Sequence, residues 1–168
     1  ALAQIETITA DNARLVSNLH ANLGGLYRMN GHPDLAREHM EKSISLLDQF
    51  NLLHINDSIP QIANYAMFLT EQQEPERGIS ELQKLSGIIK EYHSDDCLDY
   101  AKVQETLGTI YLMTANLPQA KTHFKRAFKI YEKIWADEPE MIEAKYQEIQ
   151  ELYPQVGFFL GQQISTFL

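Results

Sequence analysis

Residues 107–111 read Leu-Gly-Thr-Ile-Tyr, and residues 120–127 read Ala-Lys-Thr-His-Phe-Lys-Arg-Ala. Gly108 and Ala120 are small enough to let two helices approach closely. Tyr111 and Phe124 are large enough to fill the space on either side of that approach. This arrangement of small and large residues predicts a helical hairpin, with a first helix through Gly108 and a second through Ala120.

The same arrangement recurs along the chain at multiples of 42 residues. The matching positions of the first copy are Leu23, Gly24, Tyr27, Ala36 and Met40, and those of the middle copy are Tyr65, Ala66, Leu69, Gly78 and Leu82. Pro33 and Pro75 are also 42 residues apart, and Pro118 lies one residue from the third equivalent position. Independent matches at one offset indicate an internal repeat of 42 residues.

A single hairpin cannot bury its apolar face alone, so successive hairpins must stack. The predicted fold is therefore all-α, a right-handed solenoid of helical hairpins. We expect Ser58 and Gln61 to form a capping box, and Ser94 and Asp137 to act as N-caps. The predicted helices span residues 11–30, 33–50, 59–73, 75–92, 95–115, 118–136 and 139–153.

The Leu-Gly-x-x-Tyr and Ala-x-x-x-Phe-x-x-Ala motifs of residues 107–127 resemble those of the tetratricopeptide repeat (TPR) family. The resemblance implies a TPR-type α-α superhelix. The family period is 34, and the longer units here are similar to those of kinesin light chains and bacterial peptide-sensing regulators. The family's usual Trp is replaced by His20, Ile62 and Gln104. HEAT-like repeats, which have a similar period, are the alternative fold.

We expect one solenoid over residues 1–168. Its segments are a partial repeat or N-terminal helix (1–10), three repeats (11–52, 53–94 and 95–136) and a degenerate repeat or C-terminal cap (137–168). Because the frame begins in the middle of a hairpin, we expect a longer parent protein. The apolar tail from Phe158 to Leu168 either packs on the last repeat or contacts another subunit, which would give a homodimer through one end of the solenoid.

The composition excludes several classes of protein. The 168 residues include only 8 glycines and 6 prolines, which disfavours turn-rich β folds and disordered linkers. The net charge of −9 disfavours binding to nucleic acid or to an anionic membrane. No apolar run is long enough to span a membrane. The single Cys97 fits either a reducing compartment or a fold that needs no disulfide bond, and we expect a cytoplasmic protein.

No group of residues has the pattern of a catalytic or metal site. The six histidines lack metal-ligand spacing, and Cys97 beside His93 lacks an orienting third group. We therefore predict no catalysis, no cofactor and no metal. His39 and His123 share one repeat position, where we expect a surface role. Lys121, Lys125, Lys129 and Lys133 form a stripe on one helix, which is either a solvated face or a docking site for an acidic partner.

Asn22 and Asn64 occupy the same repeat position, and Thr106 is the third member of this series. Asn is an ordinary-to-poor residue inside a helix. It could hydrogen-bond to a neighbouring helix or face solvent, or it could bind the backbone of an extended peptide, since an amide both donates and accepts. The resemblance implies the last role, because in the TPR family this position lies on the concave face and commonly holds Asn for that purpose.

The residues one or two turns away complete the candidate peptide- or protein-binding site. Lys102 and Arg28 could meet a carboxylate, whereas Glu71 and Glu105 would suit a positively charged ligand. The candidate residues are Asn18, Asn22, Gly25, Arg28, Met29, Asn64, Met67, Lys102, Glu105, Thr106 and Thr109. We predict a protein- or peptide-binding module that is the sensor or scaffold part of a larger bacterial-type protein. The alternative is an oligomerisation module that uses the apolar tail.

Overall fold

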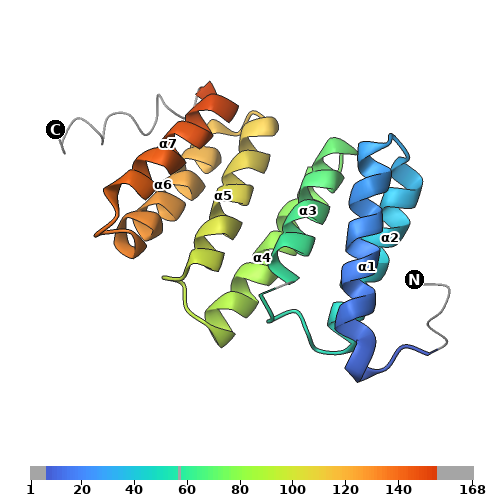
Figure 1. Cartoon of the computed structure of the whole chain (residues 1–168). Helices are drawn as coiled ribbons and strands as arrows, with labels where there is room; N and C mark the ends of the chain where they lie inside the picture. Colours follow the sequence, from blue (N-terminus) through green and yellow to red (C-terminus); the bar gives the residue numbers. More distant parts are fainter. Residues whose placement is uncertain (1–6, 57, 155–168) are drawn as a thin grey trace. The chain divides into compact units, whose positions relative to one another are not determined.

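Seven α-helices make up the regular structure of residues 7–56 and 58–154, which are the residues that the computed structural model describes (Figure 1). The helices are α1 (Ala10–Met29), α2 (Pro33–Gln49), α3 (Ser58–Glu71), α4 (Pro75–Tyr92), α5 (Leu98–Met113), α6 (Leu117–Ile134) and α7 (Pro139–Leu152). No strand occurs within these two ranges. The predicted all-α class is confirmed, and so is each predicted helix to within three residues at either end. The apolar tail and the first six residues lie outside the described ranges.

The chain divides into two compact units, which are considered separately. Unit 1 is Ala1–His93 and contains the hairpins α1–α2 and α3–α4. Unit 2 is Ser94–Leu168 and contains the hairpin α5–α6 followed by α7. In each hairpin the second helix begins with a proline in its first turn, where the missing N–H costs no hydrogen bond.

Small residues allow the two helices of a hairpin to approach closely, as the sequence predicts. A Cβ atom added to Gly78 on α4 would lie 2.6 Å from the carbonyl oxygen of Ala66 on α3. A Cβ atom added to Gly108 on α5 would lie 2.9 Å from the Phe124 ring on α6. Because Phe124 is itself fully buried, it fills the space beside this contact. The residues that define the repeat are therefore the residues that join its helices.

The start of α5 differs from the prediction. Ser94 does not cap the helix, because its hydroxyl accepts a hydrogen bond from the backbone N–H of Asp96 (3.1 Å) within a turn. Cys97 is the N-cap instead. Its backbone is extended, and its Sγ accepts a hydrogen bond from the backbone N–H of Tyr100 (3.4 Å). The prediction of Ser94 as N-cap was thus wrong by three residues.

Two other predicted caps are also wrong. The Ser58 hydroxyl lies 2.5 Å from the carbonyl oxygen of Leu53 and 2.7 Å from that of Ile55, so it ties down the preceding loop. Gln61, its expected partner in a capping box, points away to α1 and α2. At α7 the N-cap is Glu138, one residue after Asp137, and no side chain there caps the helix.

The two histidines at the shared repeat position make the same contact in the two units. The imidazole of His39 stacks on Tyr27 and that of His123 stacks on Tyr111, each with 5.3 Å between ring centroids. Both rings are half-buried. The expected surface role was therefore wrong, because each ring fills the gap between the two helices of its hairpin.

Candidate functional site

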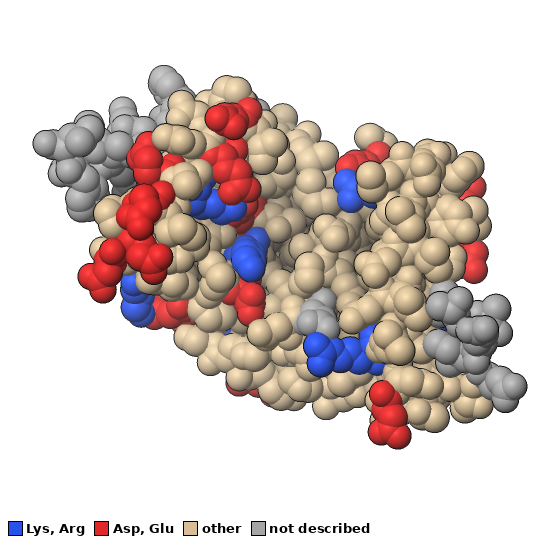
Figure 2. Space-filling model, in the orientation of Figure 1, with Lys and Arg blue, Asp and Glu red and all other residues tan. Residues whose placement is uncertain are grey.

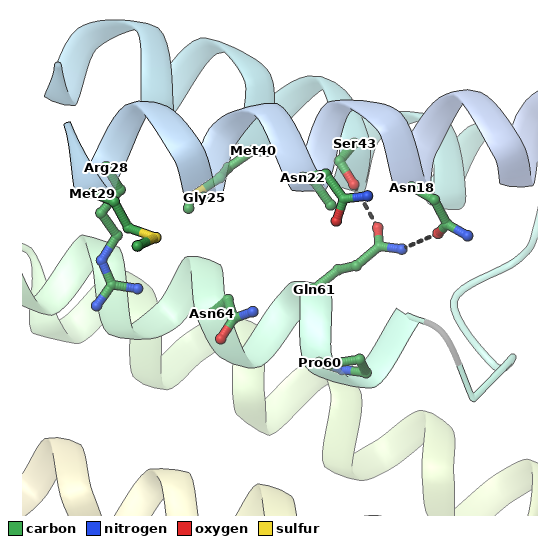
Figure 3. A pocket seen from close by; sticks show the side chains of 11 residues that line it. Asn18, Asn22, Gly25, Arg28, Met29, Met40, Ser43, Pro60, Gln61 and Asn64 are labelled. Atoms are coloured by element: carbon green, nitrogen blue, oxygen red, sulfur yellow. Dashed lines mark hydrogen bonds between the residues drawn. The ribbon is translucent and has the colours of Figure 1, made fainter.

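A cleft of about 540 Å³ opens in unit 1 between α1 and α3 (Figure 3). One wall is the face of α1 that carries positions 18, 22, 25 and 29, which share a face because they recur every three to four residues. The other wall is the first two turns of α3, and α2 supplies the floor. The lining residues are Asn18, Ala21, Asn22, Gly25, Arg28, Met29, Met40, Ser43, Pro60, Gln61 and Asn64.

Six of the predicted site residues line this cleft together. They are Asn18, Asn22, Gly25, Arg28, Met29 and Asn64. Met67, also predicted, is half-buried on α3 and does not line the cleft. The repeat position predicts this grouping, since it places residues of successive first helices on facing surfaces.

The amides of Asn22 and Asn64 are exposed on the facing helices α1 and α3. Within residues 7–56 and 58–154, neither side chain hydrogen-bonds to another group of the protein. Each amide therefore presents an acceptor oxygen and a donor nitrogen to a molecule in the cleft. These two amides are the main hydrogen-bonding groups that the cleft offers to a ligand.

Gln61 also lines the cleft, although the repeat pattern does not predict it as a site residue. Its Oε1 lies 2.9 Å from the Ser17 hydroxyl and 2.5 Å from the Ser43 hydroxyl, and its Nε2 donates to Oδ1 of Asn18 (2.5 Å). Ser17 and Ser43 are 0% and 1% exposed. One amide thus joins α1, α2 and α3 and orients Asn18 at the edge of the cleft. Two serines on the buried faces of α1 and α2 are the signal that could have indicated such a partner, because buried hydroxyls are hydrogen-bonded.

Arg28 is the one charged residue among those that line the cleft, and it is paired. Its Nε donates to Oε2 of Glu71 (2.8 Å), and its Nη2 bonds to Oε1 of the same carboxylate. This two-bond arrangement is the strong geometry for a guanidinium and a carboxylate. Arg28 and Glu71, which the sequence analysis assigned to ligands of opposite charge, therefore compensate each other.

The apolar part of the cleft comes from methionine and glycine. Met40 is 5% exposed and forms part of the floor, whereas Met29 is 84% exposed at the end of α1. A Cβ atom added to Gly25 would have no heavy atom within 4 Å, so the wall leaves open space there. Methionine side chains are flexible and adapt to the group that they contact. The open space at Gly25 leaves room for such a group in the cleft.

The other predicted site residues lie in unit 2. Lys102 is exposed and lines a second cleft of about 250 Å³ between α5, α6 and α7. Glu105 accepts a hydrogen bond from the Tyr131 hydroxyl (2.6 Å) and pairs with Lys145 (3.1 Å). The Thr106 hydroxyl donates to the carbonyl oxygen of Lys102 within its own helix, and Thr109 is buried. Thr106, the third member of the series that begins with Asn22 and Asn64, therefore bonds to its own helix.

The second cleft is built at the place in unit 2 that corresponds to the first. Lys102 follows Asn18 by 84 residues, and Lys145 follows Gln61 by the same interval. Lys145 joins α7 to α5 through Glu105 and also pairs with Glu148 (3.0 Å). Burial alone lowers the pKa of Lys145, but Glu105 and Glu148 outweigh it, so the pKa is raised and the amine stays charged. An ion pair in unit 2 thus takes the place of the amide network in unit 1.

The described residues contain no group of three or more histidine, cysteine or acidic side chains that could hold a metal ion. Within the same ranges, no helix has both the length and the apolar character needed to cross a membrane. The lysine stripe on α6 is exposed, and Lys133 pairs with Asp96. This exposure is compatible with both predicted roles of the stripe, a solvated face and a docking site for an acidic partner.

Comparison with known proteins supports the resemblance drawn from the sequence. The family model for the tetratricopeptide repeat matches residues 58–133, so the predicted resemblance is confirmed there. None of the curated proteins compared with the chain matches it significantly. The chain is similar in fold to the crystal structure of BtubC (BKLC) from P. vanneervenii, with a TM-score of 0.72 and 18% sequence identity. The match covers 94% of this chain and 61% of BtubC, so the chain spans less than two thirds of that protein. Tetratricopeptide repeats are in general non-catalytic modules for protein interaction.

Proposed function

We propose that unit 1 binds an extended peptide segment of a partner protein in the cleft between α1 and α3, and that its role is not catalytic. In this proposal Asn22 and Asn64 hydrogen-bond to the backbone of the segment. The observation that carries the proposal is the pair of exposed amides, which have no partner in the described protein and stand on facing helices across a cleft. Such amides match the donor and acceptor of a peptide unit.

The surroundings of the two amides support the proposal. The Gln61 network holds the three helices together, so the walls of the cleft are fixed before a ligand arrives. Preorganised walls reduce the ordering cost of binding. The open space at Gly25 and the thioethers of Met29 and Met40 can receive a side chain of the bound segment.

The test begins with peptides selected by the whole chain from a displayed library of random nonapeptides. Their affinities are then measured by calorimetry for the wild type and for the double variant Asn22→Ala/Asn64→Ala. A net hydrogen bond contributes about 1 kcal/mol, or about fivefold in affinity. We expect the double variant to bind about 25-fold more weakly, from two such losses.

Asn30→Ala is the matched control, because Asn30 is exposed just after α1 and does not line the cleft. It should bind the selected peptides as the wild type does. Unchanged affinity in the double variant, for every selected peptide, would remove Asn22 and Asn64 from the binding site. Circular dichroism of each variant verifies that the helices are intact.

We also propose that this module is the sensor or scaffold part of a larger cytoplasmic protein of bacterial type. The support is the similarity of its long repeats to those of bacterial peptide-sensing regulators and the presence of a single cysteine, Cys97. The sequence of the full-length gene product tests this proposal. A DNA-binding domain beside the repeats would favour a peptide-controlled regulator, and a transmembrane segment before them with the repeats outside the cell would contradict it.

A further inference from the structure

We infer that the cleft between α1 and α3 selects a peptide segment without charged side chains, and that Glu71 sets this selectivity by neutralising Arg28. The inference rests on the proposed peptide-binding function and specifies the chemical class of the ligand. It gives Glu71 a role in specificity although Glu71 does not itself line the cleft.

The lining of the cleft is nearly free of formal charge. Apart from Arg28, all of its side chains are amides, hydroxyls, thioethers, proline, alanine or glycine. Arg28 and Glu71 have side chains that are 31% and 38% exposed, so their ion pair is partly removed from water. Figure 2 shows that the visible surface over α1 and α3 carries few charged side chains.

Four other charged residues of unit 1 form ion pairs away from the cleft. Arg37 bonds to Glu74 (2.5 Å), and Arg77 bonds to Glu74 (2.5 Å) and to Glu41 (3.5 Å). These contacts join α2 to the start of α4, and none of the four residues lines the cleft. Burial of Tyr65 and its hydrogen bond to Glu41 raise the pKa of that tyrosine, so it adds no charge near neutral pH. Unit 1 therefore offers the bound segment no uncompensated charge from the walls of the cleft.

A charged peptide side chain would consequently lose hydration on entering the cleft without meeting an opposite charge. An uncharged segment has no such penalty. Its backbone can bond to the amides of Asn22 and Asn64, and an apolar side chain can contact Met29 and Met40. Removing the charge of either Arg28 or Glu71 would leave an unpaired charge beside the cleft, and the sign of that charge is opposite in the two cases. Glu71→Gln leaves Arg28 unpaired, and Arg28→Gln leaves Glu71 unpaired.

The displayed library of random nonapeptides is the probe, selected in parallel with the whole chain in three forms. The wild type should enrich peptides whose central positions are depleted in Asp, Glu, Lys and Arg. Glu71→Gln should enrich acidic peptides, with affinity about fivefold higher than that of the wild type, the upper end for a partly exposed charge pair. Arg28→Gln should shift the preference toward basic peptides. Glu74→Gln is the control, because it removes a paired carboxylate that does not line the cleft, and it should leave the selection unchanged.

The outcomes separate this inference from the proposed function. Enrichment of charged peptides by the wild type, or an unchanged charge preference in both Glu71→Gln and Arg28→Gln, would overturn the inference while peptide binding stands. Failure to enrich any peptide would overturn the proposed peptide binding itself, and equal binding by Asn22→Ala/Asn64→Ala would remove these two amides from the binding site. Raising the salt concentration should weaken the acidic preference of Glu71→Gln and leave wild-type binding unchanged, since only the former depends on a free charge.

Discussion

Replacing each of two glycines of α4 by alanine should have opposite effects on stability. Gly78 and Gly87 both lie inside this helix, so the gain in helix propensity is the same, about 1 kcal/mol in favour of alanine. At Gly87 an added Cβ meets nothing within 4 Å. Gly87→Ala should therefore stabilise the protein by most of that amount.

At Gly78 the added methyl group meets the backbone of the neighbouring helix. Its distances to the carbonyl oxygen, carbonyl carbon and Cα of Ala66 are 2.6, 3.2 and 3.3 Å. Backbone atoms inside α3 cannot rotate away, so α3 and α4 must separate by several tenths of an ångström. Overpacking of this kind costs about 1–3 kcal/mol. After the gain in propensity, Gly78→Ala should destabilise the protein by up to about 2 kcal/mol.

Urea unfolding followed by circular dichroism measures both variants against the wild type. We expect the midpoint to rise for Gly87→Ala and to fall for Gly78→Ala, with a difference in unfolding free energy of about 1–3 kcal/mol between them. Equal midpoints for the two variants would refute the reasoning, because they would mean that the contact of α4 with Ala66 does not restrict residue 78.

Two other predictions concern the interior polar groups. Gln61→Leu should destabilise the protein by about 1 kcal/mol, the contribution of one net hydrogen bond, because the buried hydroxyls of Ser17 and Ser43 can still bond to each other (3.0 Å). Urea unfolding measures the change in unfolding free energy. A loss above about 3 kcal/mol would mean that the two serine hydroxyls do not satisfy each other. Burial, followed by nearby positive groups, lowers the folded-state pKa of His20 and His123 below 6.5, so the unfolded chain binds more protons and stability should fall as the pH drops through 6.5. Urea midpoints at pH 7.5 and 5.5 check this expectation, and it fails if the midpoint is the same at both or is higher at pH 5.5.

The repeat and its helices could be predicted because the residues that fix them act locally. A glycine or alanine at a helix contact, and a large residue one turn away, can be recognised in the sequence without any knowledge of the partner helix. Ser94 and Cys97 show where this reasoning stops. Both can accept a hydrogen bond at a helix start, and the choice between them depends on the turn that Ser94 forms with Asp96.

The candidate site could be predicted only in part, for a similar reason. The position shared by Asn22 and Asn64 follows from the period of 42 residues. The pairing of Arg28 with Glu71 does not, because it joins residues 43 apart and depends on how α1 lies against α3. Asn18 and Gln61 are also 43 residues apart, so the contacts across this cleft connect positions that are offset by one from the repeat.

The bridging residues Gln61 and Lys145 bear on how a repetitive chain finds its correct order. Repeats of similar sequence can assemble with the wrong neighbour, which is a characteristic failure of such proteins. If α7 packed against α1 and α2 in place of α3, the charge of Lys145 would lie against the buried hydroxyls of Ser17 and Ser43. No carboxylate would be there to pair with it, because α1 has Ala21 at the position that corresponds to Glu105. If α3 took the place of α7, Glu105 would lose its cation. The different side chains at these equivalent positions therefore favour the correct pairing of helices and destabilise pairings between the wrong repeats.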